Sequence, residues 1–383
     1  RFTFSGVQEI LVRVEKRLYK HVVRSYTNIN FSQKILLDEL ETARDIVINK
    51  HQSLFLEELN DVINKIRIFG FHFATLDIRQ DSRVHHDAFR HLVTDLLASG
   101  DTTFPENYFT LSEKQQVAFL ATIKGKIDPT ILTDEMSVKT IESMYALKTI
   151  QARNGERGAN RYIISNNQTA LHVMQAFAML NLCDFENGLS VDVIPLFETV
   201  EDLQNAEEVM RSIYSNTNYR EHLTQRKNKQ TIMLGFSDGT KDGGYLMANW
   251  GIFKAKEALT KISREFGIEV IFFDGRGGPP ARGGGKTHQF YASLGSTIED
   301  KEIQLTVQGQ TISSNFGTLN SSQYNLEQLL SSGIKNDVFT KDQLNDAHRT
   351  IIDDLATTSY KAYVDFKNHP QFLPYLEEMS TLK

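Results

Sequence analysis

Residues 231–245 read TIMLGFSDGTKDGGY. The first six residues form a short, mostly apolar run of strand-forming residues, which gives way to a polar, glycine-rich segment. An amphipathic stretch with helical spacing then extends from about 245 to 266. A strand followed by a helix of this length predicts a βα unit, in which the strand belongs to a parallel sheet.

The same alternation recurs along the chain. Further strands are predicted at 71–78, 162–165, 191–197, 269–273 and 303–307. Helical patterns fill the segments between them and dominate both ends of the chain. We therefore expect residues 1–383 to form a single helix-rich α/β domain, with a helical lead-in at 1–68, a parallel sheet at 69–310 and a helical region at 311–383. The alternation itself is compatible with either a doubly wound sheet or a barrel.

The composition excludes several classes of protein. Of 383 residues, 40% are hydrophobic, and the formal net charge is −6, which argues against a nucleic-acid-binding protein. No apolar stretch approaches the length of a membrane span, and no signal peptide is visible. Cys183 is the only cysteine, so we expect a small buried residue and a reducing, cytoplasmic setting. Because the chain starts at Arg1 with a helical pattern already under way by Val7, we expect a piece of a longer protein.

Charged residues lie at the predicted strand ends. Because the carboxyl ends of parallel strands meet at one edge of a sheet, we expect the side chains of Arg79, Glu198, Asp238, Lys241 and Arg276 to gather there. The two carboxylates suit Mg²⁺ or Mn²⁺, which take few protein ligands. The three cations suit a phosphate or carboxylate ligand. The alternative is that these residues are solvated loop charges or ion pairs.

A glycine-rich loop follows the strand predicted at 269–273. Residues 274–286 read DGRGGPPARGGGK and include Arg276 and Arg282. Glycines allow backbone amides to approach an anion, and a helix predicted from about Thr287 adds a positive amino-terminal end. The loop is not a Walker A motif, because Pro280 occupies the position of its first glycine. His85 and His86 are adjacent and cannot share a helix face, so we expect surface or capping roles for them.

These motifs, in this order, resemble phosphoenolpyruvate carboxylase. The matching stretches are FGFHFATLDIRQ at 69–80, PLFET at 195–199, GFSDGTKDGGY at 235–245, GRGG at 275–278 and RGGG at 282–285, with a fainter TVQG at 306–309. The resemblance covers nearly the whole chain and is weakest between about 100 and 160. It implies an incomplete (β/α)₈ TIM-type barrel with many additional helices.

The resemblance also implies an activity and a set of site residues. Enzymes of this family are carbon–carbon lyases that join phosphoenolpyruvate to bicarbonate, giving oxaloacetate and phosphate, with Mg²⁺ or Mn²⁺. The resemblance further implies that the full-length enzyme is a homotetramer in the cytoplasm and that it replenishes oxaloacetate for the tricarboxylic acid cycle. Carried over by position, Glu198 and Asp238 would be the metal ligands. The substrate-binding and catalytic residues would be Arg79, Lys241 and Arg276, with Gly277 and Gly278 for substrate binding and Arg282 for the carboxyphosphate stage.

Several departures from the family pattern stand out. The catalytic histidine of the family lies in a Thr-Ala-His-Pro motif that does not occur here. Asp274 replaces a histidine at the start of the glycine loop, Val307 replaces a common glutamate, and Asn315 falls near a common lysine. We therefore expect a central segment of the enzyme that is inactive alone. Two alternatives remain: a non-catalytic anion-binding or assembly module, and another metal-dependent barrel, such as an aldolase-like lyase.

Overall fold

The computed structural model describes residues 4–23, 31–185, 188–276, 283–307, 309–338 and 344–380. The chain divides into two compact units. The helical unit comprises Arg1–Ile78 and Glu142–Arg161, and the sheet unit comprises Arg79–Ile141 and Tyr162–Lys383. Among the described helices, none is both long and apolar enough to cross a membrane.

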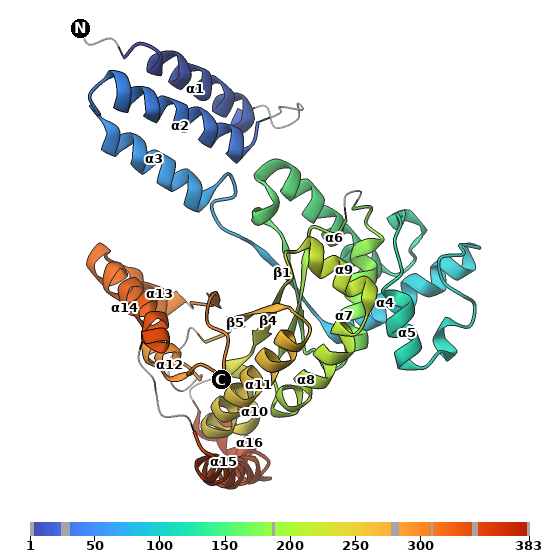
Figure 1. The fold of residues 1–383 in the computed structure, drawn as a ribbon. Coiled ribbons are helices and arrows are strands. Elements are labelled where there is room, and N and C mark those ends of the chain that lie inside the picture. Colours follow the sequence, from blue (N-terminus) through green and yellow to red (C-terminus); the bar gives the residue numbers. More distant parts are fainter. Residues whose placement is uncertain are drawn as a thin grey trace. The chain divides into compact units, whose positions relative to one another are not determined.

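The helical unit is built on three successive amphipathic helices, α1 (Val7–Val23), α2 (Gln33–Lys50) and α3 (Leu56–Phe69), drawn in blue in Figure 1. Apolar residues at helical spacing bury one face of each helix, and the shared core includes Val14, Leu40 and Ile63. The sequence predicts a helical lead-in at 1–68, and these three helices lie at 7–69 of the chain.

Six strands form one sheet within the described residues, in the order in which they occur along the chain. They are β1 (Asp77–Asp81), β2 (Arg161–Ser165), β3 (Asp192–Phe197), β4 (Lys229–Leu234), β5 (Glu269–Asp274) and β6 (Ile303–Leu305). A doubly wound sheet reverses its strand order, whereas a barrel adds each strand beside the previous one. This parallel sheet follows the second pattern and curls into a half-barrel, so the expected incomplete barrel is confirmed.

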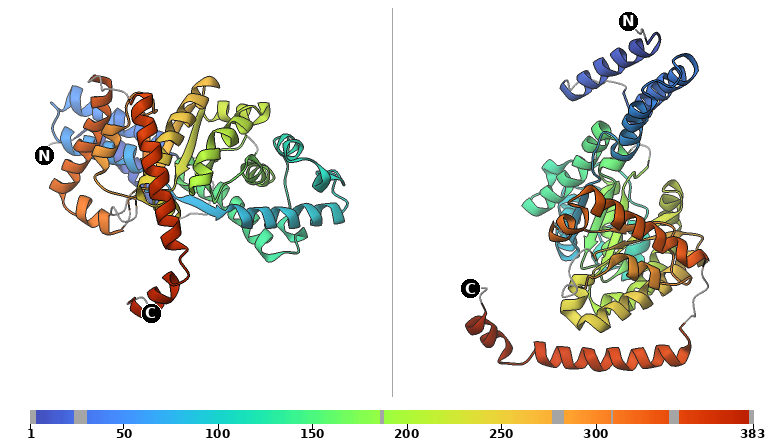
Figure 2. Two further views of the ribbon diagram at one scale, coloured as in Figure 1. Left: turned by 90° about the horizontal axis from the view of Figure 1, so that it is seen from below. Right: turned by 90° about the vertical axis from the view of Figure 1, so that its left-hand side faces the viewer.

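Helices occur in the sheet unit between and after the strands (Figures 1 and 2). They are α4 (Ser82–Ala98), α5 (Glu113–Leu120), α7 (Ala170–Asn181), α8 (Val200–Tyr214), α9 (Thr217–Gln225), α10 (Phe236–Gly243), α11 (Tyr245–Glu265), α12 (Thr287–Ser293), α13 (Gly309–Phe316), α14 (Leu319–Val338), α15 (Asp346–Lys367) and α16 (Phe372–Met379). Helix α6 (Glu135–Asn154) belongs to both units, and three short 3₁₀ helices lie at Tyr108–Thr110, Pro129–Ile131 and Glu156–Gly158. Helices α10 and α11 also contact α15.

The strands end in one row. Phe197 of β3 pairs with Leu234 of β4, Leu234 pairs with Asp274 of β5, and Asp274 pairs with Leu305 of β6. The next backbone N–H continues each ladder: Gly235 donates to the Phe197 carbonyl at 2.9 Å. The segments that follow these strands therefore leave the sheet side by side.

The first strand differs from the prediction. The sequence predicts it at 71–78, whereas the structure places it at Asp77–Asp81. Gly70 and Phe73 have φ angles of 52° and 59°, in the left-handed region, which a strand cannot continue through. The apolar run there is therefore a turn after α3 and not a strand. The other strand boundaries lie within two residues of their predicted positions.

Both faces of the sheet are packed. Ile163, Ile194, Leu196, Met233 and Phe273 form a buried cluster contributed by β2 to β5. Side chains alternate between the faces of a strand, so the residues between them face the helices. Cys183 is buried, as expected, and the single tryptophan, Trp250, is also in the core.

The expectation of a surface or capping role for His85 is wrong. Its side chain is fully buried instead of lying at the surface, and its Nε2 is 2.8 Å from the Tyr162 hydroxyl. Ser82, His85 and Phe89 recur at helical spacing and form the buried face of α4. Because this face packs inward, the helix carries His85 into the core. Burial lowers the pKa of His85 to about 4.

This buried histidine predicts a pH dependence of stability. Between pH of roughly 6.5 and 4 the unfolded chain binds a proton at this residue and the folded chain does not, so stability falls as the pH falls. His85→Gln is expected to reduce the slope of the free energy of unfolding by about 1.4 kcal/mol per pH unit in that range. Urea unfolding at pH 7, 6 and 5 measures the slope. Tyr162→Phe, which keeps the buried imidazole, should retain it, and a His85→Gln slope equal to that of the wild type would contradict the assignment.

Candidate active site at the carboxyl ends of the strands

Glu198 follows β3 on a tightly held piece of backbone. Its N–H and that of Thr199 both donate to Asp202 Oδ2, at 3.2 and 2.9 Å. Thr199 and Asp202 also form the capping box that begins α8. The next N–H, that of Val200, donates to Asp242 Oδ2 at 3.0 Å. Three successive N–H groups are therefore bonded to carboxylates, which leaves Glu198 little backbone freedom.

The Glu198 carboxylate lies among charged neighbours. Burial raises its pKa, and the charge of Asp238 adds to that rise. The N–H of Asn166, which donates to Glu198 Oε2 at 2.7 Å, and the guanidinium of Arg79 act in the opposite direction. A second carboxylate beside a partly buried one favours either a proton or a cation between them. The structure thus places Asp238 and Arg79 close enough to Glu198 to act on its charge.

Arg79 lies within β1 and not beyond its end, because the strand is shifted from its predicted position. Its Nη2 is 3.3 Å from the sulfur of Met233, a member of the cluster on one face of the sheet. Arg79 itself is exposed. Its guanidinium therefore remains available to an anionic ligand near Glu198.

Asp238 and Lys241 both lie on α10, which begins where β4 ends. Lys241 Nζ is 2.7 Å from Asp238 Oδ1, and the two side chains are 67% and 51% exposed. The sequence assigned one residue to a metal and the other to an anion, whereas the structure pairs them with each other. An ion pair this exposed contributes at most about 1 kcal/mol to the stability of the fold, so a ligand can separate the two side chains.

Glycine allows α10 to approach Glu198 closely. A Cβ at Gly235 would lie 3.1 Å from Glu198 Cγ and 3.2 Å from its Cα. A Cβ at Gly239 would lie 3.2 Å from the Glu198 carbonyl oxygen. These distances are shorter than ordinary carbon contacts, so any larger residue would push α10, and Asp238 with it, away from Glu198.

Arg276 faces its own loop. The side chain is only 5% exposed and stacks over Phe290 of α12, with its guanidinium carbon 4.4 Å from the ring centroid. Its Nη2 donates to the Gly284 carbonyl at 3.2 Å, and burial lowers its pKa. Within the described residues, no hydrogen bond or ion pair joins Arg276 to Glu198 or Asp238. Gly277, Gly278 and Arg282 lie outside the described residues.

The donor set fits a hard divalent cation. Among the described residues, no group of three or more His, Cys, Asp or Glu side chains could enclose a metal ion. Mg²⁺ does not require such a cage, because one or two carboxylates with water and substrate oxygens complete its octahedron. Glu198 and Asp238 supply two carboxylates of this kind, each from a backbone segment fixed at a strand end.

Some contributors to the site were not predicted from sequence. Asp202 and Asp242 hold the backbone of Glu198, and Asn166 donates to its carboxylate through a main-chain N–H. The Thr-x-x-Asp spacing at 199–202 is a capping signal that could have identified Asp202. A main-chain donor such as Asn166 leaves no signal in the sequence.

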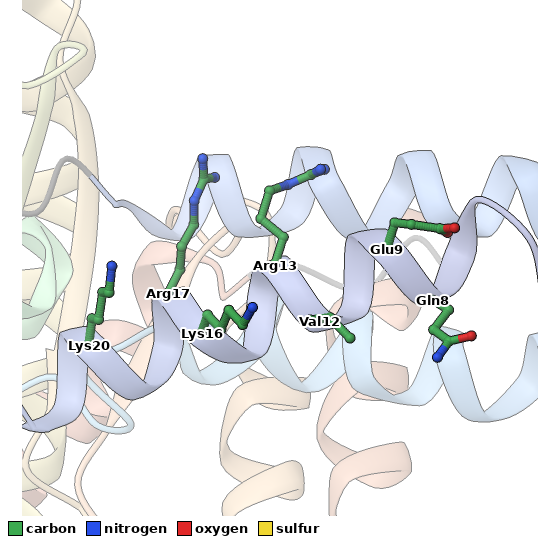
Figure 3. Close-up of a pocket in the computed structure, with 7 residues that line it drawn as sticks. All are labelled: Gln8, Glu9, Val12, Arg13, Lys16, Arg17 and Lys20. Carbon is green, nitrogen blue, oxygen red and sulfur yellow. The ribbon is translucent and has the colours of Figure 1, made fainter.

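A groove lies in the helical unit. This groove of about 730 Å³ runs along α1 and is lined by Gln8, Glu9, Val12, Arg13, Lys16, Arg17 and Lys20 (Figure 3). Arg13 and Arg17 donate to Glu39 of α2, so both already have an acidic partner. The groove contains none of the strand-end residues, all of which belong to the sheet unit.

A curled parallel sheet with carboxylates and cations after its strands is typical of metal-dependent barrel proteins that bind anionic ligands. The family model for phosphoenolpyruvate carboxylase matches residues 3–383 of the chain. A curated relative, the phosphoenolpyruvate carboxylase of Nitrosomonas eutropha (strain DSM 101675 / C91 / Nm57), is 30% identical over 402 residues. That match covers 100% of this chain and 42% of the relative. The chain belongs to the phosphoenolpyruvate carboxylase family, and it spans less than half the length of this relative.

The close approach at Gly235 generates a testable expectation. Gly235→Ala should displace Glu198 and lower the affinity for Mn²⁺ by about 10- to 100-fold. This is the range seen when a residue that orients a metal-ligating side chain is lost. Titration calorimetry with Mn²⁺ measures the change. Gly333→Ala is a matched control, because a Cβ there has no neighbour within 4 Å. Equal Mn²⁺ affinities for the two variants would show that the contact does not position the carboxylate.

Proposed function

We propose that the protein containing this chain is a phosphoenolpyruvate carboxylase, which joins phosphoenolpyruvate to bicarbonate and releases oxaloacetate and phosphate. The observation that carries the proposal is the convergence of Glu198 and Asp238, which follow β3 and β4, with Arg79 of β1. It is supported by the family match along the chain and by the name of the relative. The substrates carry several negative charges. A bound divalent cation together with guanidinium groups suits substrates of this kind.

Glu198 and Asp238 would hold Mg²⁺ or Mn²⁺. When bound, the ion would supply charge neutralisation for the phosphate and for the enolate oxygen. Arg79 and Lys241 would bind the carboxylate and phosphate oxygens of phosphoenolpyruvate. For Lys241 this means exchanging Asp238 for a substrate oxygen, and the solvent exposure of the pair makes the exchange easy.

The chemistry requires neutralisation before bond formation. An oxygen of bicarbonate attacks phosphorus, and the bond from phosphorus to the enol oxygen breaks, leaving the enolate and carboxyphosphate. Carboxyphosphate then divides into carbon dioxide and phosphate, and the enolate carbon bonds to carbon dioxide. Bicarbonate is a weak nucleophile toward an anionic phosphoryl group, so Arg79, Lys241 and Arg276 would have to stabilise the charge that develops on its oxygens.

The remaining roles follow from the family. Gly277 and Gly278 would contact the phosphoryl group, and Arg282 would serve the carboxyphosphate stage. The absence of a Thr-Ala-His-Pro motif from this sequence supports the proposal that the chain alone does not catalyse the full reaction. For the whole protein we propose a cytoplasmic homotetramer that replenishes oxaloacetate.

Calorimetry with the chain itself tests the site. Phosphoenolpyruvate should bind in the presence of Mn²⁺, and the double variant Glu198→Ala, Asp238→Ala should lose that metal-dependent binding. Glu201→Ala, an exposed carboxylate in the first turn of α8, should bind as the wild type does. The whole protein should form oxaloacetate from phosphoenolpyruvate and bicarbonate, and no product would refute the proposed activity.

A non-catalytic anion-binding module is the second candidate. The observation that favours it is the resting arrangement of the cations, since Lys241 is paired with Asp238 and Arg276 with its own loop. A module of this kind would bind inorganic phosphate equally well with and without Glu198 and Asp238. Unchanged phosphate binding by the double variant, together with an inactive whole protein, would favour this reading.

A further inference from the structure

A buried ionic cluster lies at the carboxyl end of β5, where side chains of α11 and α12 meet the strand. Lys256 Nζ of α11 is 2.7 Å from Oδ2 of Asp274, the last residue of β5. Tyr291 of α12 donates its hydroxyl to the same oxygen, also at 2.7 Å. The side chains of Lys256 and Asp274 are 1% and 0% exposed. We call Lys256, Asp274 and Tyr291 the β5 cluster.

The β5 cluster fixes two helices to the end of one strand. The backbone of Asp274 pairs with Leu234 on one side and Leu305 on the other, so its position is set by the sheet. Within the described residues, Asp274 Oδ1 has no hydrogen-bond partner. Lys256 and Tyr291 are therefore the groups that hold this carboxylate. Loss of either should leave a buried charge or polar group poorly compensated, which proteins tolerate badly.

The β5 cluster is linked to Arg276 through one aromatic ring. Phe290 immediately precedes Tyr291 on α12, so the bond from Tyr291 to Asp274 also sets the place of Phe290. The Phe290 ring centroid is 4.4 Å from the guanidinium carbon of Arg276 and 5.3 Å from Lys256 Nζ. Lys256 and Arg276 thus contact the same ring. Arg276 lies two residues beyond Asp274 in the chain.

The electrostatic environment of Lys256 also links the β5 cluster to Arg276. Burial lowers the pKa of Lys256, and the adjacent Asp274 carboxylate opposes that effect. The positive charge of Arg276 lowers the pKa of Lys256 further, so the two cations are close enough to repel each other. Asp274 therefore compensates Lys256 in a region where Arg276 is also held.

We propose that Lys256, Asp274 and Tyr291 are positioning residues for Arg276. They hold α12 against the end of β5, and α12 presents the Phe290 ring on which the guanidinium rests. The inference rests on the proposed function for one point alone, namely that Arg276 binds phosphoenolpyruvate. The placement of Arg276 by the β5 cluster can be measured without any catalytic assay.

Limited trypsin digestion of the chain measures that placement, because cleavage after Arg276 requires its buried side chain to leave Phe290. Two variants are compared with the wild type: Tyr291→Phe, which leaves both charges in place, and Lys256→Met with Asp274→Asn, which removes them together. Each should speed cleavage after Arg276 by about tenfold or more. Cleavage after Lys124, an exposed residue in the segment that follows α5, should be unchanged.

Lys254→Met is the matched control, since Lys254 lies on the same helix and pairs with Asp353 at the surface. Cleavage after Arg276 and after Lys124 should proceed in this variant at the wild-type rates. Cleavage after Arg276 that stays at the wild-type rate in both variants would overturn the proposal. Equal acceleration after Arg276 and Lys124 would also overturn it, because the β5 cluster would then serve overall stability alone.

Kinetics of the whole protein test the consequence for catalysis. Tyr291→Phe should lower kcat/KM for phosphoenolpyruvate by about 10- to 100-fold, with a higher KM for this substrate and an unchanged KM for bicarbonate. A loss of folded enzyme would lower kcat and leave both KM values unchanged, and that result would contradict the positioning role. If the wild-type protein forms no oxaloacetate, the proposed function fails, while the digestion result still decides whether the β5 cluster positions Arg276.

Discussion

The register of three parallel strands governs the arrangement of the whole site. Phe197, Leu234 and Asp274 end β3, β4 and β5 in one hydrogen-bonded row. Because the strands are parallel and follow one another in order, the segments after them emerge at the same edge. Glu198, the first turn of α10 and Arg276 are neighbours for this reason. A shift of one residue between any two strands would turn their side chains to opposite faces and separate these groups.

Around this edge, charged side chains are supported by backbone groups and by one another. The N–H groups of Glu198, Thr199 and Val200 are bonded to carboxylates, and the Glu198 carboxylate accepts a further N–H from Asn166. Lys241 neutralises Asp238 at the surface. A ligand that enters therefore exchanges partners with groups that are already satisfied. In the absence of a ligand, groups paired in this way are more stable than buried groups left desolvated and unpaired.

Burial divides the ionic pairs into two kinds. The pair of Lys241 and Asp238 is largely exposed, so water screens it and it can open. The pair of Lys256 and Asp274 is enclosed between β5, α11 and α12, so opening it would leave charges without solvent. The exposed pair is suited to ligand exchange and the buried pair to holding structure, although both consist of a lysine and an aspartate.

The sequence by itself determined the alternation of strands and helices, the family and most of the charged residues at the strand ends, because periodicity and short motifs are local properties. It misplaced the first strand, since the left-handed conformations of Gly70 and Phe73 break an apolar run that reads as extended. It also placed His85 at the surface. Only the tertiary structure decided that the strand order makes a half-barrel, that Lys241 pairs with Asp238, and that Asp274 is buried against Lys256. These features depend on how separate segments pack, and a side chain's partner is set by that packing more than by its own neighbours in the chain.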